Sequence, residues 1–168
     1  MLKSEKKILS LILSVCMLIC LIPTAVFAAD SGSYMKIAML DCGRKYFTVD
    51  WVKSLIYEAK ADGFTHVMLA VGNDGMRFLL DDMSLTVGSK TYSSEAVKAA
   101  VISGNNSYTT ASTGEWTESE MNEIFSAAAS SGIEIIPLLN TPGHMDAILS
   151  AATSLTGTNC SYNGSVRT

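Results

Sequence analysis

Three short apolar runs along the chain each end at a cluster of polar residues and glycine. They are Met35–Leu40, His66–Val71 and Ile133–Leu139. The third run is too short for a buried helix and is rich in β-branched residues, so it is typical of a strand that is covered on both faces. All three runs therefore predict β-strands, and the polar clusters predict turns at their carboxyl ends.

Segments with the apolar spacing of helices follow these strands. The first runs from Val49 to about Asp62, the second begins at the capping box Thr117–Glu120 and ends at Gly132, and the third runs from about Met145 to Leu155. The predicted buried faces are Trp51, Leu55, Ile56 and Ala59 in the first helix, and Met121, Ile124, Phe125 and Ala128 in the second. Each strand is therefore expected to be followed by an amphipathic helix.

An insertion separates the second strand from its helix. Met83–Val87 and Lys90–Tyr92 flank a Gly-Ser pair, which predicts a tight β-hairpin. A short helix is expected from Ser93 or Ser94 to Ile102, and then a polar surface loop from Gly104 to Gly114. The alternation of strands and helices outside this insertion favours an α/β fold with a parallel sheet. An open sheet and a barrel both fit, although a complete eight-stranded barrel needs about 250 residues.

The first 29 residues have the pattern of a secretory signal peptide. Three lysines precede an apolar stretch from Ile8 to Val26, and Ala28 or Ala29 offers a small-residue cleavage site. A retained membrane anchor is the alternative, and Pro23 and the alanines argue against it. We therefore expect a protein that is secreted or held at the cell surface, with no stable membrane span after cleavage and with residues 30–168 as a single domain.

Composition excludes several other classes of function. The first 29 residues hold three of the 12 basic and one of the 16 acidic residues, so the remainder carries nine Lys and Arg against 15 Asp and Glu. Without a basic patch, nucleic acid is a poor candidate partner. Cys42 and Cys160 remain after cleavage, and their pairing is left open. The two histidines lie apart with no Cys or His spacing for zinc, so no metal and no cofactor are expected.

The three strand ends carry motifs that resemble one known family. Asp41–Phe47, Val71–Phe78 and Pro142–Asp146 occur in this order, and together they resemble the catalytic barrel of family 20 glycoside hydrolases, the β-N-acetylhexosaminidases. The likeness is greatest to surface exo-β-N-acetylglucosaminidases of Gram-positive bacteria, which carry a stretch similar to Leu80–Met83. The resemblance implies a partial (β/α)8 TIM barrel, the first three strand–helix units with a hairpin insertion after the second strand. Residues 30–168 would then be the amino-terminal portion of the catalytic barrel.

The resemblance also implies roles for four site residues. Arg44 matches the arginine that grips the 3- and 4-hydroxyls of the terminal sugar, for which a rigid fork of donors is suited. His144 matches the histidine that supports the catalytic acid. Asn73 and Asp74 lie where the family has a polar pair that orients this histidine. Alignment on the following Gly-Met-Arg leaves Asp74 one position late, so a catalytic role and a turn-pinning role both stay open for it.

Other charged residues near the strand ends have structural interpretations. Asp41 and Arg77 are expected to form a buried ion pair or to cap the barrel mouth. Asp146 is expected to cap its helix, with a place in the pocket as the alternative. His66 begins a strand and is expected to be a satisfied structural residue rather than a ligand.

The family's mechanism needs an adjacent Asp-Glu pair, and the sequence contains no Asp-Glu dipeptide. The substrate's own acetamido oxygen is the nucleophile in this family, and the missing pair supplies the orienting carboxylate and the general acid. We therefore expect a fragment of a secreted enzyme that acts on glycans with terminal N-acetylglucosamine or N-acetylgalactosamine, and no hydrolysis by the chain alone. The alternatives are a non-catalytic secreted sugar-binding α/β protein, or another secreted α/β enzyme that shares only the architecture.

Overall fold

The computed structural model describes residues 34–108 and 113–160. The predicted signal peptide lies outside the described residues. Within the described ranges, no helix is long and apolar enough to cross a membrane. The described residues from Met35 onward form one compact unit.

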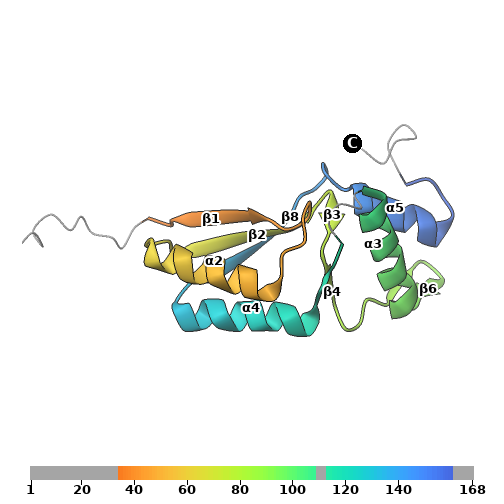
Figure 1. Cartoon of the computed structure of the whole chain (residues 1–168). Coiled ribbons are helices and arrows are strands. Elements are labelled where there is room, and N and C mark those ends of the chain that lie inside the picture. The colour runs from red at the N-terminus through yellow and green to blue at the C-terminus, as the bar shows by residue number, and fades with distance from the viewer. Residues whose placement is uncertain (1–33, 109–112, 161–168) are drawn as a thin grey trace, which may run out of the picture. The chain divides into compact units, whose positions relative to one another are not determined.

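The three predicted strands form a parallel sheet. β1 (Ile37–Asp41), β2 (His66–Asn73) and β8 (Glu134–Leu139) lie in the order β1–β2–β8 (Figure 1). In this register Asp41 pairs with Ala70 and Leu139 pairs with Gly72. All three strands therefore end at the same edge of the sheet. In the part of the chain that the structure describes, the sheet is open and does not close into a barrel.

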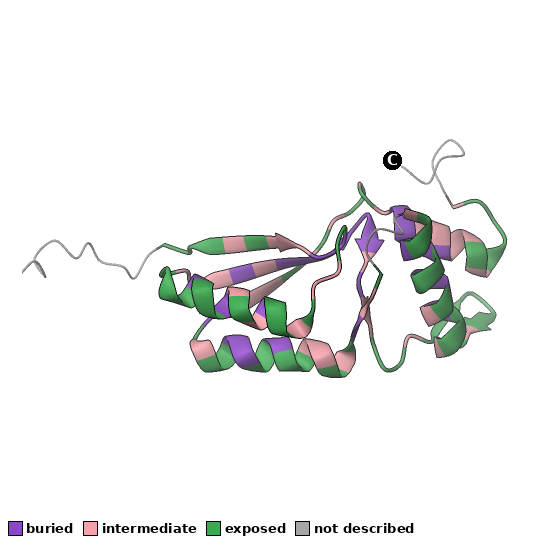
Figure 2. Ribbon diagram, viewed as in Figure 1, coloured by how far each residue is buried: buried purple, intermediate pink, exposed green. Residues whose placement is uncertain are grey.

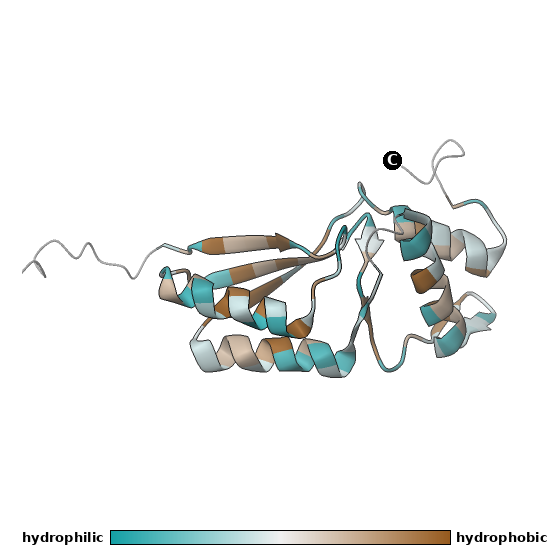
Figure 3. Ribbon diagram, viewed as in Figure 1, coloured by the Kyte–Doolittle hydropathy of each residue, from teal (hydrophilic) through white to brown (hydrophobic). Residues whose placement is uncertain are grey.

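Two helices cover one face of this sheet. α2 (Val49–Ala61) and α4 (Glu118–Ser131) lie side by side beneath the strands (Figure 1). The core between them and the sheet is made of Val52, Ile56, Ala59, Val67, Leu69, Val71, Ile124, Ala128 and Ile133. Figure 3 shows the corresponding hydrophobic colour on the three strands. The prediction that a parallel sheet packs against amphipathic helices is therefore confirmed.

The buried faces of both helices are rotated from the predicted ones. Trp51 is 46% exposed and stacks on Phe47 with ring centroids 4.5 Å apart, while Val52 occupies the core. In α4, Phe125 is 37% exposed, whereas Ala127, which was not predicted to be buried, is 8% exposed and joins Ile124 and Ala128 on the buried face. Apolar residues flank each true buried face, so helical spacing alone admits both rotations.

The third strand is not covered on both faces, contrary to the prediction. β8 consists only of exposed and half-buried residues and pairs only with β2 among the described strands. β1 is also largely exposed or half-buried, whereas most of β2 is buried (Figure 2). The reason is that, among the described residues, helices cover only one face of the three strands, and β1 and β8 also lack a strand neighbour on one side. His66, at the start of β2, contacts Glu134 at 3.3 Å, as a structural residue would.

The start of α4 forms the predicted capping box. Thr117 accepts a hydrogen bond from the Glu120 backbone, and the Glu120 carboxylate accepts one from the Thr117 backbone. We expect Thr117→Ala to lower the free energy of unfolding by about 1 kcal/mol, measured by urea denaturation. Ser119→Ala, at an exposed position in the same turn, is the control. Equal losses in the two variants would contradict the capping role.

The insertion between β2 and α4 contains more structure than predicted. The hairpin β5 (Leu85–Val87) and β6 (Lys90–Tyr92) is present as expected. The unpredicted pairs are β3 (Gly75–Met76) with β2 and β4 (Phe78–Leu79) with β7 (Trp116–Thr117), and the second pair ties the two ends of the insertion together.

The helix of the insertion is longer than predicted. α3 spans Ser94–Tyr108, so the first part of the expected polar loop is helical. Position 104 of α3 requires glycine, because any side chain there would collide with the backbone of Ala147. Residues 109–112 lie outside the described part.

The last helix packs on the insertion rather than on the sheet. α5 (Asp146–Thr156) lies beside α3, and Ala100, Val101 and Ala151 form a small second core there (Figure 1). Its N-cap is Met145, which makes no side-chain capping bond. Asp146 is instead the first helical residue and is 5% exposed. The prediction that Asp146 caps this helix is therefore wrong.

Candidate active site

Three loops meet at the carboxyl edge of the sheet. They follow β1 at Asp41–Lys45, β2 at Gly72–Gly75 and β8 at Asn140–Met145. Backbone hydrogen bonds join them, since Gly43 N donates to Ala70 O at 2.8 Å and Asn140 N donates to Gly72 O at 2.7 Å. In parallel α/β folds this edge is where ligands bind. The functional candidates therefore lie on loops that are fixed to one another.

Arg44, Asp74 and His144 form a cluster across these loops. The Arg44 Nε donates to Asp74 Oδ2 at 2.8 Å, and the His144 Nδ1 lies 3.1 Å from Asp74 Oδ1. The Arg44 Nη2 also lies 3.2 Å from His144 Nδ1. The Arg44 and His144 side chains are 45% and 52% exposed, whereas that of Asp74 is 11% exposed. Asp74 is thus the buried centre of the cluster, and the other two side chains face solvent.

The His144 Nδ1 cannot hydrogen-bond both neighbours at once. It accepts from the Arg44 guanidinium only when it is unprotonated, and it donates to the Asp74 carboxylate only when it carries a proton. A single nitrogen therefore alternates between an arginine and a carboxylate according to its tautomer.

Asn73 joins a second chain of contacts. Its Nδ2 donates to Asp41 Oδ2 at 2.7 Å, and its Oδ1 accepts from Asn140 Nδ2 at 3.1 Å. Asp41 also lies 3.3 Å from the Arg44 Nη1. Asn73 therefore links the loops after all three strands and does not contact His144 through any described hydrogen bond. Of the predicted polar pair, Asp74 is the member beside the histidine.

Two site residues have left-handed backbone conformations. Asp74 has φ of 61° and His144 has φ of 55°, a region that non-glycine residues seldom adopt. Their backbones are joined directly, because Asp74 N donates to His144 O at 2.7 Å. This link compensates for the unfavourable conformations and aims both side chains at each other. Such strain held by surrounding contacts is frequent at functional sites.

Contacts within the cluster shift the pKa values of Asp74 and Arg44. Burial alone raises the pKa of Asp74, but hydrogen bonds from Arg44, His144 and Tyr108 outweigh it, and the pKa lies below its ordinary value of 3.8. The hydrogen bond to Asp74 raises the pKa of the Arg44 guanidinium above its ordinary value. Asp74 is therefore an ionised carboxylate at neutral pH and orients its neighbours rather than donating a proton.

The low pKa of Asp74 also makes the stability of the fold depend on pH. Because the pKa of Asp74 is lower in the folded state, its stabilising contribution is complete above the ordinary value of 3.8 and is lost as the pH falls through the folded value. We expect the thermal midpoint of the native protein to fall more steeply below about pH 4 than that of Asp74→Asn. Scanning calorimetry at several pH values measures this, and parallel acid curves for the two proteins would contradict it.

Arg77 has a different partner from the predicted one. Its guanidinium is fully buried and lies 3.5 Å from Glu115 Oε1, while Asp41 pairs with Arg44. Loss of hydration lowers the pKa of Arg77, and Glu115 partly offsets this. The expected Asp41–Arg77 ion pair is therefore wrong, because the β4–β7 pairing places Glu115 beside Arg77.

Burial raises the pKa of the Cys42 thiol to about 12, and Cys42 and Cys160 are both free.

Sequence reasoning missed two residues at the site, Asn105 and Tyr108. Tyr108 hydrogen-bonds Asp74 from the end of α3, and Asn105 binds the backbone that follows Asp74. Both lie in the region that was expected to be a polar loop or its boundary. Continuation of the helical spacing from Val97 and Val101 to Asn105 was the available signal.

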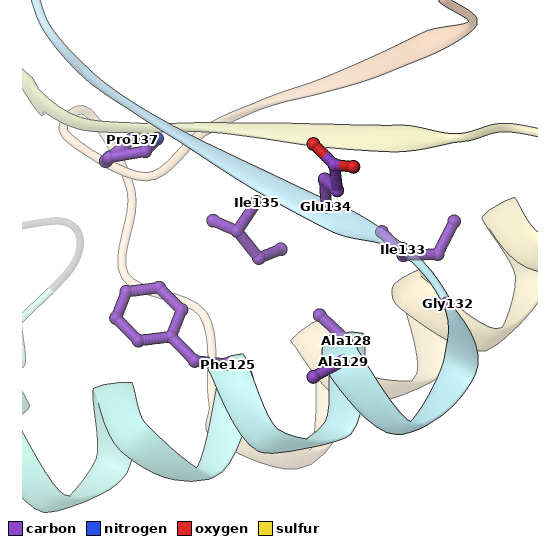
Figure 4. Close-up of a pocket in the computed structure, with 8 residues that line it drawn as sticks. All are labelled: Phe125, Ala128, Ala129, Gly132, Ile133, Glu134, Ile135 and Pro137. Atoms are coloured by element: carbon purple, nitrogen blue, oxygen red, sulfur yellow. The ribbon is translucent and has the colours of Figure 1, made fainter.

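An apolar hollow lies away from this cluster. It has a volume of about 590 Å³ and lies between α4 and β8. Figure 4 shows Phe125 and Ala128 from α4 opposite Ile135 and Pro137 from β8. Only Glu134 offers a charged group there, so the hollow lacks the polar groups of the strand-end cluster. No group of three potential metal-ligating side chains occurs within residues 34–108 and 113–160.

Among solved structures, this chain is similar to parts of β-N-acetylglucosaminidases and β-N-acetylhexosaminidases. The pneumococcal exo-β-D-N-acetylglucosaminidase StrH shares 43% sequence identity, with a TM-score of 0.70, over 73% of this chain and 30% of the pneumococcal chain. The N-acetyl-β-hexosaminidase of Streptomyces plicatus shares 27% identity, with a TM-score of 0.51, over 68% of this chain and 20% of that chain. This chain therefore spans less than a third of either relative.

A comparison with family models identifies the family itself. The model described as glycosyl hydrolase family 20, catalytic domain, matches residues 36–167. The resemblance inferred from the three strand-end motifs is thereby confirmed, including its likeness to the Gram-positive enzyme. Since the match extends over most of its length, this chain belongs to glycoside hydrolase family 20 and spans part of the family's catalytic domain.

Proposed function

We propose that this chain is the amino-terminal part of a secreted β-N-acetylhexosaminidase, which releases terminal N-acetylhexosamine residues from glycans. The cluster of Arg44, Asp74 and His144 at one edge of the parallel sheet is the observation that carries the proposal. Solved relatives support it, because a mutant of the Streptomyces plicatus β-hexosaminidase has been described in complex with its product GlcNAc. We further propose that the open sheet is the first part of a (β/α)8 barrel.

Arg44 is suited to bind the hydroxyls of the terminal sugar. A guanidinium has five N–H donors, and Arg44 directs one at Asp74, one at Asp41 and one toward His144. Tyr108 also hydrogen-bonds this guanidinium, so a ligand that takes two donors displaces Tyr108 or His144, and the side chain is 45% exposed. Vicinal hydroxyls can accept from two donors, whereas Asp74 and Asp41 hold the guanidinium in place. The preferred ligand is therefore a sugar with free 3- and 4-hydroxyls, as at the non-reducing end of a glycan.

His144 is proposed to support a catalytic acid that this sequence does not contain. Asp74 is held ionised and is paired with Arg44, so it is unsuited to give a proton to the leaving group. The family's acid and orienting carboxylate form an Asp-Glu pair, which is absent from the 168 residues. Asp74 and His144 then act by orientation, and the substrate's acetamido oxygen is the nucleophile.

The proposal is tested by hydrolysis and by binding. The complete enzyme that carries this chain is expected to cleave a chromogenic β-N-acetylglucosaminide with retention, whereas the chain alone is expected to bind N-acetylglucosamine without cleaving the chromogenic substrate. Binding is measured by ligand-observed NMR, with the Arg44→Ala chain as the control because it lacks the guanidinium that binds the sugar hydroxyls. A complete enzyme that cleaves β-glucosides and β-N-acetylglucosaminides equally would overturn the substrate class.

A non-catalytic sugar-binding protein is the second candidate. In this candidate Arg44 supplies the sugar contact, and Asp74 and His144 serve binding and orientation only. In this case the complete protein binds N-acetylglucosamine but leaves the chromogenic substrate intact at every pH. Measurable turnover by the complete protein excludes this candidate.

Export of the protein is part of the proposal. Lys3, Lys6 and Lys7 and the apolar stretch after them predict cleavage near Ala28 or Ala29. We expect the mature protein, recovered from a culture that secretes it, to begin between Ala28 and Asp30 when its amino terminus is sequenced. Recovery of an intact Met1 in a membrane fraction would instead favour the retained anchor.

A further inference from the structure

The inserted helix α3 contacts both loops that carry the site. Asn105, near its end, is fully buried and binds the backbone of Met76 at two points. Its Oδ1 accepts from Met76 N at 2.7 Å, and its Nδ2 donates to Met76 O at 2.7 Å. Met76 lies two residues after Asp74, so this pair of hydrogen bonds fixes the turn from which Asp74 projects.

The same turn of α3 also fixes the loop that carries His144. Gly104 packs so closely on α5 that a β-carbon there would collide with the Ala147 carbonyl. Ala147 N in turn donates to Asp74 O at 2.7 Å. The last turn of α3 therefore holds the backbone that follows His144 as well as the backbone that follows Asp74.

Glu115 and Arg77 extend these contacts to the loop of Arg44. Glu115 Oε1 accepts from Asn105 Nδ2 at 2.8 Å and lies 3.5 Å from Arg77 Nη1. The Arg77 Nε donates to Gly43 O at 3.2 Å, directly before Arg44 in the sequence. Asn105, Glu115 and Arg77 thus form a connected chain of contacts from the Asp74 turn to the Arg44 loop.

Burying the polar residues Asn105, Glu115 and Arg77 does not by itself favour stability. Arg77 is 0% exposed, and its Nη2 has no hydrogen-bond partner among the described atoms. A buried, incompletely satisfied guanidinium is seldom more stabilising than apolar packing of the same volume. Its retention between two site loops is better explained by the geometry that it imposes on them.

We propose that Asn105, Glu115 and Arg77 are positioning residues, which together set the separation of Arg44, Asp74 and His144. The three residues do not belong to the cluster that faces solvent, and they act through the backbones of Gly43 and Met76. The expected effect on sugar binding rests on the proposed function. The effect of the three residues on the geometry of the cluster does not. The insertion after β2 is then the part of the chain that shapes the site.

Two measurements on the full chain distinguish a change in the geometry of the cluster from a change in sugar affinity. The imidazole resonances of His144 report the geometry of the ligand-free cluster, and those of His66, at the opposite end of β2, are an internal reference. Affinity for N-acetylglucosamine, from ligand-observed NMR, reports the functional consequence. Asn105→Ala is expected to shift the His144 resonances, leave those of His66 in place and weaken sugar binding about tenfold.

Matched variants distinguish positioning from loss of stability. Val101→Ala removes a buried side chain from the second core on the same helix and leaves the polar chain intact. Asn106→Ala changes an exposed asparagine next to the critical one. Asn105→Asp keeps the shape and the Oδ1 acceptor but loses both Nδ2 donations, so it replaces Asn105→Ala should that variant fail to fold. Only the Asn105 variants are expected to move the His144 resonances.

The possible outcomes are distinct. Equal shifts in Val101→Ala and Asn105→Ala would overturn the proposal, as would unchanged His144 resonances in both Asn105 variants. Should the native chain fail to bind N-acetylglucosamine while the His144 resonances respond to Asn105 alone, the proposed sugar site fails and the positioning role stands. Weaker binding with unchanged His144 resonances would overturn the positioning role and leave the sugar site in place.

Discussion

Replacing Arg44 by alanine is expected to lower kcat/KM of the complete enzyme for a chromogenic β-N-acetylglucosaminide by about a hundredfold or more. If Arg44 binds the sugar as proposed, the variant loses two charge-assisted hydrogen bonds to it, each worth about 1.5–3 kcal/mol. It also leaves Asp74, at 11% side-chain exposure, without its 2.8 Å partner. Steady-state kinetics give the ratio, and the isolated chain should lose detectable binding of N-acetylglucosamine.

Two control variants make the Arg44 prediction specific. Lys45→Ala removes the neighbouring positive charge, which lies over the Phe47 ring rather than at the cluster, and it should leave kcat/KM within about twofold. Arg44→Lys keeps the charge but loses the planar fork, and it should recover only part of the activity. A full recovery by lysine would mean that charge alone matters, and an unchanged rate in Arg44→Ala would rule out sugar binding by this residue.

Gly43→Ala is expected to be the most disruptive of the small substitutions in the site loops. A β-carbon on Gly43 would lie 2.5 Å from the carbonyl oxygen and 2.8 Å from the Cα of Asn73, and rigid backbone cannot yield as a flexible side chain would. We expect the free energy of unfolding to fall by about 3 kcal/mol, the upper part of the range for overpacking. Urea denaturation measures the loss, with the buried Trp116 as a fluorescent reporter.

Gly143→Ala is the matched control for Gly43→Ala. Gly143 lies in another site loop, next to His144, and a β-carbon there would meet nothing within 4 Å. Its substitution should therefore change the free energy of unfolding by less than about 0.5 kcal/mol. In the complete enzyme Gly43→Ala should also reduce turnover, because it forces the Arg44 loop away from Asn73 and Asp74. Similar losses in the two glycine variants would show that contact between the β1 and β2 loops is not the cause.

Much of the site was accessible from local sequence patterns. Short apolar runs with turn residues behind them predicted parallel strands, and the carboxyl ends of parallel strands meet at one edge. This was sufficient to expect Arg44 and His144 near each other, although 100 residues separate them in the chain. The three motifs also indicated the family, since each is a local pattern that can be recognised in the sequence without knowing the contacts between them.

The identity of the residue beside His144 depended on the tertiary structure. Alignment by motif favoured Asn73 as the partner and left Asp74 one position late. The left-handed backbone at Asp74 turns its side chain toward His144, whereas Asn73 turns toward Asp41. A one-residue change of direction in a tight turn depends on backbone angles, and here those angles are set by contacts with the His144 loop rather than by neighbours in sequence.

The sequence by itself determined the order of the three main strands and of the helices, the capping box and the edge at which the polar motifs gather, because each of these follows from short-range spacing. Only the tertiary structure decided that α3 continues to Tyr108, that α5 packs on α3, and that Arg77 pairs with Glu115. These features arise from contacts between residues that lie far apart in the chain. Their energies depend on burial and distance, and neither quantity exists until the chain has folded.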